Sequence, residues 1–220
     1  GSFSDRLTVV KQVLARFVAR RRGDRLGLIL FGTRAYVQVP LTFDSDTLIQ
    51  LLNEAQINFA GEQTAIGDAI GLAIKRLKNR PDQSRVLILL TDGANTAGEI
   101  DPEKAAELAS HAGLKIYTIG IGADRLTVKS LFGSQVINPS RDLNERVLKA
   151  IADNTGGRYF RAKNSEELVQ IYQLLDQLEP VEQEAQLFRP VKALYPWPLA
   201  ISLLLASLVL TLPLIRERRS

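Results

Sequence analysis

The sequence contains no cysteine and one histidine, and both scarcities exclude classes of chemistry. Without cysteine there can be no disulfide bond, no thiolate nucleophile and no cysteine-based zinc or iron–sulfur site. The single histidine, His111, excludes clusters of histidine ligands and leaves one candidate for a histidine general base. Because His111 lies near the predicted C-terminal end of a helix, we interpret it as a residue that stabilises that helix end.

Charge gives little indication of a polyanionic partner. The 220 residues are 45% hydrophobic and 24% charged, which is the composition of a folded protein. The formal net charge is +4, and the three arginines and one glutamate of residues 216–219 contribute two of these charges. The remainder of the chain is close to neutral, so nucleic-acid binding is not predicted.

An uncharged apolar run occupies residues 198–215. As a helix it would span about 27 Å, close to the roughly 30 Å of a bilayer's hydrocarbon core. Tyr195 and Trp197 precede the run and arginines follow it, as at the two interfaces of a membrane-spanning helix. We predict a linker and interfacial segment at 181–197, a transmembrane helix at 198–215 and a basic cytoplasmic tail at 216–220. A buried core helix is the alternative for the apolar run.

The other end of the chain carries no recognisable secretory signal. Residues 1–5 have neither a basic region nor an apolar one. The chain does not begin with methionine, which indicates a fragment or an engineered sequence.

Residues 1–180 alternate between amphipathic helices and apolar strands. Helices are predicted at 6–22, 44–52, 66–77, 101–113, 142–154 and 165–178. Strands at 26–31, 85–90 and 115–122 are apolar throughout, as in parallel strands buried on both faces, and weaker strands are predicted at 35–40 and 158–161. The alternation predicts an α/β fold with a doubly wound, mostly parallel sheet. We interpret Arg20, Arg21 and Arg22 as a solvated helix end.

The carboxyl ends of the strands are where an open parallel sheet binds ligands. This rule selects loops 32–34, 91–98 and 122–124, with the helix-leading loop 61–64 beside them. Oxygen-bearing side chains in such loops suit a hard cation such as Mg²⁺. Asp92 directly follows an apolar strand, where a carboxylate is costly unless it is neutralised. Capping of a turn is the alternative role for Asp92, and we interpret Asp68 as a structural residue at a helix start.

Three segments resemble the von Willebrand factor A (VWA) domain with its metal-ion-dependent adhesion site: GEQTAIGDAI, RVLILLTDGANTAG and KIYTIGIG. More narrowly, residues 5–42 and the later NTGGRYFRA are similar to the bacterial Bat aerotolerance proteins of the BatA/BatB type, in which a transmembrane helix follows the domain. The resemblance implies that Thr64 and Asp92 are metal ligands. The family's first strand and its Asp-x-Ser-x-Ser motif are absent from the chain. Gly1-Ser2 is either the tail of that motif or a remnant of cloning.

These observations together predict a membrane-anchored, non-catalytic module at residues 1–180 that binds partner proteins through Mg²⁺ or another divalent cation. The resemblance implies other Bat-type proteins and a MoxR-type ATPase as partners, in envelope and oxidative stress tolerance. It also implies a bacterial inner-membrane location with the soluble domain in the periplasm. Two alternatives are a Mg²⁺-dependent hydrolase that uses Asp92 and a purely structural membrane tether.

Overall fold

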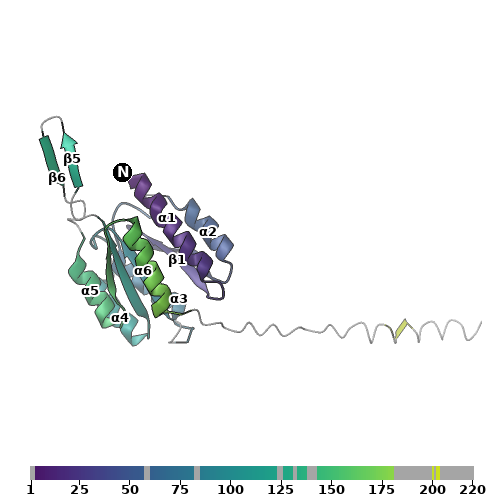
Figure 1. Ribbon diagram of the computed structural model, residues 1–220. Coiled ribbons are helices and arrows are strands. Elements are labelled where there is room, and N and C mark those ends of the chain that lie inside the picture. The colour runs from purple at the N-terminus through teal and green to yellow at the C-terminus, as the bar shows by residue number, and fades with distance from the viewer. Residues whose placement is uncertain are drawn as a thin grey trace, which may run out of the picture. The chain divides into compact units, whose positions relative to one another are not determined.

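The computed structural model describes residues 3–56, 60–81, 85–122, 126–130, 133–137, 143–180, 200 and 202–203. The chain divides into two units, Gly1–Glu184 and Ala185–Ser220. The first unit carries the helices and strands shown in Figure 1. In chain order these are α1 (Phe3–Arg20), β1 (Leu26–Phe31), β2 (Ala35–Thr42), α2 (Ser45–Glu54), α3 (Ile66–Leu77), β3 (Val86–Thr91), α4 (Pro102–His111), β4 (Lys115–Ile121), β5 (Leu126–Ser130), β6 (Gly133–Ile137), α5 (Glu145–Asn154), β7 (Tyr159–Ala162) and α6 (Ser165–Leu178).

Parallel strands form the centre of the fold, as the sequence predicts. The order is β3-β4-β7, with β3 and β4 in register from Val86↔Lys115 to Thr91↔Gly120. The middle strand β4 is buried at every position between its two ends, and the hydroxyl of its Thr118 donates to the carbonyl of Leu148 in α5 at 2.9 Å. A separate antiparallel pair joins β1 to β2.

Two hydrophobic clusters cover the strands from opposite sides. One contains Phe17 of α1, Leu48 of α2 and Tyr172 of α6, and the other is built from α3, α4 and α5 with Ile116 of β4 at its centre. Phe17 and Tyr172 pack with their ring centroids 4.8 Å apart. Helices therefore cover both faces of the sheet, which confirms the predicted α/β architecture.

The sheet is interrupted between β1 and β3. Both strands contribute side chains to both clusters, so they lie in the same layer. Among the described strands, however, β1 pairs with β2 and β3 pairs with β4, and β1 and β3 do not pair with each other. Apolar residues of β1 and most of those of β3 are consequently only half-buried. The prediction that strands 26–31 and 85–90 are buried on both faces is therefore wrong in degree, because each has a strand neighbour on one side only.

Several smaller expectations differ from the structure. The strand expected to end at Pro40 continues to Thr42, and α5 begins at Glu145, capped by Asn144. The last helix lies at 165–178 as predicted, and its cap is Asn164, whose Oδ1 accepts from the Glu167 amide at 2.8 Å. The β5-β6 hairpin was not predicted from the sequence at all. Among the described residues no helix is long and apolar enough to cross a bilayer, and most of the predicted span 198–215 lies outside them.

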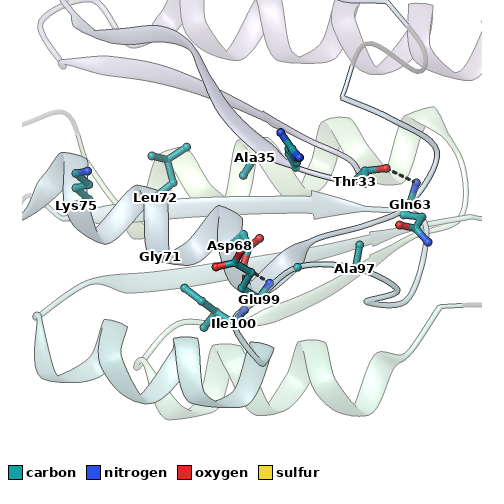
Figure 2. A pocket seen from close by; sticks show the side chains of 12 residues that line it. Thr33, Ala35, Gln63, Asp68, Gly71, Leu72, Lys75, Ala97, Glu99 and Ile100 are labelled. Carbon is teal, nitrogen blue, oxygen red and sulfur yellow. Dashed lines mark hydrogen bonds between the residues drawn. The ribbon is translucent and has the colours of Figure 1, made fainter.

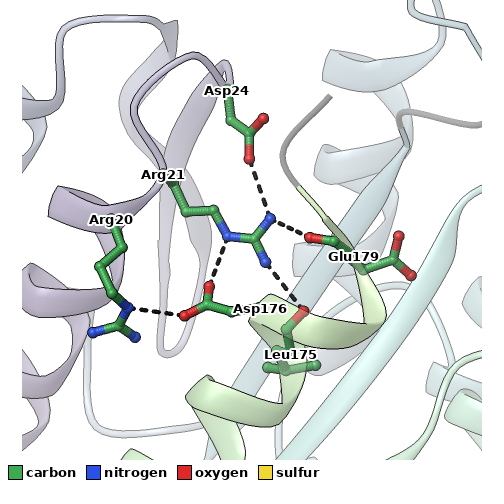
Figure 3. A network of polar contacts seen from close by, with 6 residues as sticks. All are labelled: Arg20, Arg21, Asp24, Leu175, Asp176 and Glu179. Carbon is green, nitrogen blue, oxygen red and sulfur yellow. Dashed lines mark hydrogen bonds and ion pairs between the residues drawn. The ribbon is translucent and has the colours of Figure 1, made fainter. Parts of the chain in front are cut away.

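A buried arginine joins the first helix to the last. Arg21, only 5% exposed, donates through Nε to Asp176 at 2.9 Å and through Nη2 to the carbonyl of Leu175 at 3.1 Å, and a further bond reaches the carbonyl of Glu179 (Figure 3). Its guanidinium also lies 5.0 Å from the centroid of the Phe17 ring. The interpretation of residues 20–22 as a solvated helix end is wrong for Arg21, because the C-terminal carbonyls of α6 attract its charge into the interior.

Replacement of Arg21 by alanine should reduce the free energy of unfolding by about 2–4 kcal/mol, because buried carbonyls and Asp176 lose a charged donor. Arg22→Ala, at an exposed neighbour, should change it by less than about 0.5 kcal/mol. Urea unfolding followed by circular dichroism measures both. Equal effects of the two substitutions would show that the buried network adds no stability.

Candidate metal centre

Two loops that the sequence places far apart meet at the end of β1. The Ala65 amide donates to the carbonyl of Gly32 at 2.7 Å, and the Gln63 amide donates to Thr33 Oγ1 at 3.3 Å. Gly61, with φ +95°, lies so close to Thr33 that a Cβ there would be 2.2 Å from Thr33 Oγ1. Only glycine can lie this close to Thr33 with a positive φ, and the contact holds the loop that carries Thr64 against the end of β1.

The loop after β3 pairs with the same segment from the other side. The Thr64 amide donates to Thr96 Oγ1 at 2.9 Å, and the Thr64 carbonyl accepts from the amides of Thr96 and Ala97 at 2.9 and 3.1 Å. A Cβ at Gly93 would lie 3.5 Å from Thr64 Oγ1. The hydroxyl of Thr64 is therefore next to the residue that follows Asp92, as the shared strand-end location predicts.

Residues of this same loop also hold the first turns of α3. Ala65 offers no side-chain cap, and Asn95 Oδ1 accepts from the Ile66 amide at 2.8 Å instead. Asp68 Oδ1 accepts from the amides of Glu99 and Ile100, both at 3.0 Å. The structure thus gives Asp68 a structural role, as interpreted from the sequence, although the carboxylate fixes a distant loop rather than only favouring a helix start.

Asp92 does not cap its own turn. That task falls to the buried Thr91, whose hydroxyl oxygen accepts from the Gly93 amide at 3.3 Å and donates to the Gly93 carbonyl at 3.2 Å. The Asp92 side chain is exposed, and among the described residues it has no hydrogen-bond or ion-pair partner. Its carboxylate is therefore available to a ligand.

The donor set is suited to a hard cation but small. Thr64 and Asp92 offer a hydroxyl and a carboxylate, and Mg²⁺ takes oxygen ligands while it keeps several waters. Within the described ranges there is no group of three acidic or histidine side chains that could hold a metal ion. The donor chemistry fits a hard cation, and by themselves the two residues would supply part of a coordination shell and not a complete one.

Other residues singled out in the sequence lie apart from this centre. Ser2 and most of loop 122–124 fall outside the described residues. His111 is exposed at the end of α4, where its Nδ1 lies 2.7 Å from the carbonyl of Glu107. Loop 91–98 is selected by the sequence, but the roles of Thr91, Asn95 and Thr96 within it are not. The one signal is the poor capping residue Ala65, which indicates a cap from elsewhere.

Beside the centre runs a groove of about 740 Å³, which we call the α3 groove (Figure 2). One wall is α3, with Asp68, Gly71, Leu72 and Lys75. The others are loop 97–100 and the turn 33–35, with Gln63 at the end nearest Thr64. Thr64 and Asp92 do not line the groove themselves, so the groove is a neighbour of the centre and not the centre itself.

Comparison with known families agrees with this fold and this arrangement of loops. The model of the von Willebrand factor type A domain family matches residues 1–174, and the chain belongs to that family. Within it, the relatives identify a Bat-type VWA protein. The structure of BatB from Bacteroides thetaiotaomicron is 26% identical, covers 79% of this chain and 88% of that one, and has a TM-score of 0.62.

Further relatives extend the comparison. An aerotolerance-related membrane protein from Bacteroides fragilis is 27% identical, with 78% of this chain and 87% of that one covered and a TM-score of 0.62. A protein of Borreliella burgdorferi is 30% identical over 169 residues, which are 72% of this chain and 48% of that protein. The chain thus spans about half the length of this curated relative. A further solved structure is that of proximal thread matrix protein 1 from the mussel byssus, with its MIDAS motif occupied by zinc. It is 22% identical, the match covers 78% of this chain and 40% of that one, and the TM-score is 0.60. At this identity the likeness shows the fold alone.

In the absence of metal, substitution should lower stability at Thr91, the last residue of β3, but not at Asp92, which follows it. Thr91→Val should lower the free energy of unfolding by about 1–2 kcal/mol, because two partly buried hydrogen bonds are lost. Asp92→Ala should change it by less than about 0.5 kcal/mol. Thermal melting in EDTA checks both. A cost of about 1 kcal/mol at Asp92, as expected for a lost cap, would restore its turn-capping interpretation.

Proposed function

We propose that this chain is a membrane-anchored, non-catalytic interaction module that binds a partner protein through a divalent cation held by Thr64 and Asp92. The proposal rests on the different roles of Thr91 and Asp92 at the end of β3. Thr91 closes the turn, so the Asp92 carboxylate has no structural task and lies exposed beside the loop of Thr64.

Electrostatics supports a cation at this position. The Asp92 carboxylate is exposed and has no partner among the described residues, so a cation would neutralise it, and the nearby Thr64 hydroxyl could supply a second oxygen ligand. When bound, Mg²⁺ would supply an open coordination position that a carboxylate of the partner can fill. The chain's own residues hold and orient the ion, and nothing in this role requires a bond to be broken.

The setting proposed for the module follows from its relatives. The Bacteroides fragilis relative is a membrane protein related to aerotolerance. We propose that residues 198–215 anchor this chain in the bacterial inner membrane, with the domain in the periplasm and the arginines of the tail in the cytoplasm. Other Bat-type proteins and a MoxR-type ATPase are the proposed partners, in tolerance of envelope and oxidative stress.

The cation hypothesis is tested by melting wild type and Asp92→Ala with Mg²⁺ and with EDTA. Mg²⁺ should stabilise only the wild type, by about 2.7 kcal/mol when its concentration is a hundred times the dissociation constant. The same pair is compared after an apolar strand ending in Asp-x-Ser-x-Ser is added ahead of Gly1, since the resemblance places the remaining ligands there. Equal stabilisation of both proteins by Mg²⁺ would exclude Asp92 as a ligand.

The anchor hypothesis is tested by fractionation. The full chain should sediment with membranes and resist extraction at high salt, whereas a chain that ends at Arg189 should remain in the supernatant, because the uncharged run is removed. Recovery of the full chain in the supernatant without detergent would contradict the anchor.

A further inference from the structure

The two ends of the strands carry charge of opposite sign. The connections that lead into β1 and β3 are basic: residues 20–25 contain four arginines and one aspartate, and residues 76–85 contain four basic residues and one acidic residue. The connection that leaves β3, residues 91–102, contains three acidic residues and no basic one. The nearly neutral total therefore hides a separation of charge along the strands.

A chain of contacts joins the two basic connections into one surface, which we call the basic edge. Arg21 donates to the carbonyl of Glu179 (Figure 3), and the Glu179 carboxylate accepts from Lys115 Nζ at 2.6 Å. The Lys115 amide donates to the carbonyl of Arg85 at 3.0 Å. Arg85 in turn donates to the carbonyl of Lys78 at 3.0 Å. The amino ends of the parallel strands and the helix ends beside them thus form a continuous surface.

Most of the acidic groups at the basic edge are already engaged. Asp24 and Asp176 form ion pairs with Arg21, Asp44 caps α2, and the Glu179 carboxylate binds β4. These carboxylates are held by partners within the domain, so they are not available to neutralise further cations.

Several cations of the basic edge have no such partner. The exposed side chains of this edge that form no hydrogen bond or ion pair within the described residues are four cations and two carboxylates: Arg22, Arg76, Lys78 and Arg158 against Asp46 and Asp153. The excess is positive, so the edge is complementary to an anionic surface.

The last helix brings the chain to this same edge. Leu178 ends α6, and Glu179 is held there through its carbonyl and its carboxylate. Residues 181–197, the predicted connection to the membrane span, therefore start from the basic edge. A connection of this kind keeps the edge at high effective concentration near the bilayer, whose anionic lipids attract basic groups within about a Debye length.

We propose that the basic edge binds the anionic lipid headgroups of the membrane that anchors the chain. The opposite end of the strands, with Thr64 and Asp92, then faces water, where a partner can reach it. The proposal rests on the anchor of the proposed function and is independent of the cation.

Labelled full-length chains in vesicles test the proposal, and the absence of cysteine allows a single label. Asn79→Cys carries a fluorophore at an exposed position of the basic edge, and Gln63→Cys carries it at an exposed position of the opposite end. The vesicles contain phosphatidylcholine alone or equal amounts of phosphatidylcholine and phosphatidylglycerol, with a trace of lipid that bears a nitroxide quencher on its headgroup.

Quenching at Asn79 should be several times greater with phosphatidylglycerol than without it, and it should disappear at about 1 M NaCl, where the Debye length is about 3 Å. Quenching at Gln63 should be weak in both lipids. Equal quenching at the two positions, or quenching at Asn79 that does not depend on phosphatidylglycerol, would overturn the proposal.

Charge variants with a matched control locate the contact. The pair Arg76→Gln and Lys78→Gln should lower the ratio of bound to free domain about fivefold for each charge and so remove most of the quenching at Asn79. The pair Arg34→Gln and Lys104→Gln removes the same charge from exposed positions at the opposite end of the strands and should have no such effect. Equal losses for the two pairs would show attraction by net charge alone and contradict a defined surface.

Flotation of the same vesicles separates this proposal from the anchor. A chain that stays with the vesicles in high salt, without quenching at Asn79 in either lipid at low salt, keeps the anchor and overturns the basic edge. A chain that leaves the vesicles in high salt, yet binds those with phosphatidylglycerol in low salt with Asn79 quenched, loses the anchor and keeps the basic edge.

Discussion

The functional end of this domain depends on one interlock, the attachment of loop 92–100 to the first turns of α3. Asn95 caps the helix, Thr64 exchanges hydrogen bonds with Thr96, and Asp68 accepts from the amides of Glu99 and Ile100. These contacts place the Thr64 hydroxyl beside the Asp92 loop and form one wall of the α3 groove. Without these bonds the loop of Thr64 and the loop of Asp92 would not be held side by side.

Three basic side chains of the described residues bind the carbonyls at helix ends. Lys11 donates to the carbonyl of Asn53 at the end of α2 at 2.7 Å, and Arg85 donates to the carbonyls of Arg80 and Lys78 after α3. Arg21 does the same for α6. Basic side chains near C-terminal carbonyls stabilise the helix dipole.

Local patterns in the sequence predict most of the fold. Apolar runs locate the central strands, and Asp101 followed by Pro102 locates the start of α4, because both signals depend on residues close in the chain. The burial of Arg21 and the capping of α3 by Asn95 could not be predicted, since each joins segments that are distant in sequence.

The candidate site shows the same limit. The sequence identifies Asp92 and Thr64, but it cannot decide between a ligand and a turn cap at Asp92. The hydroxyl that takes the capping role belongs to Thr91, and its orientation depends on the fold of the turn. The half-burial of β1 was also beyond local pattern, because an apolar run does not reveal how many strand neighbours it has.

The last turn of α6 has a consequence for how the domain would carry mechanical load. Arg21 of the first helix region bonds the carbonyls of Leu175 and Glu179, and the Glu179 carboxylate accepts from Lys115 and Tyr117 of β4, both at 2.6 Å. A force applied to the chain after Glu179 would therefore load the bonds to Arg21 and the bonds to β4 at the same time. Bonds loaded together resist more force than bonds that open one after another, so tension would reach the core before it could peel α6 from the sheet.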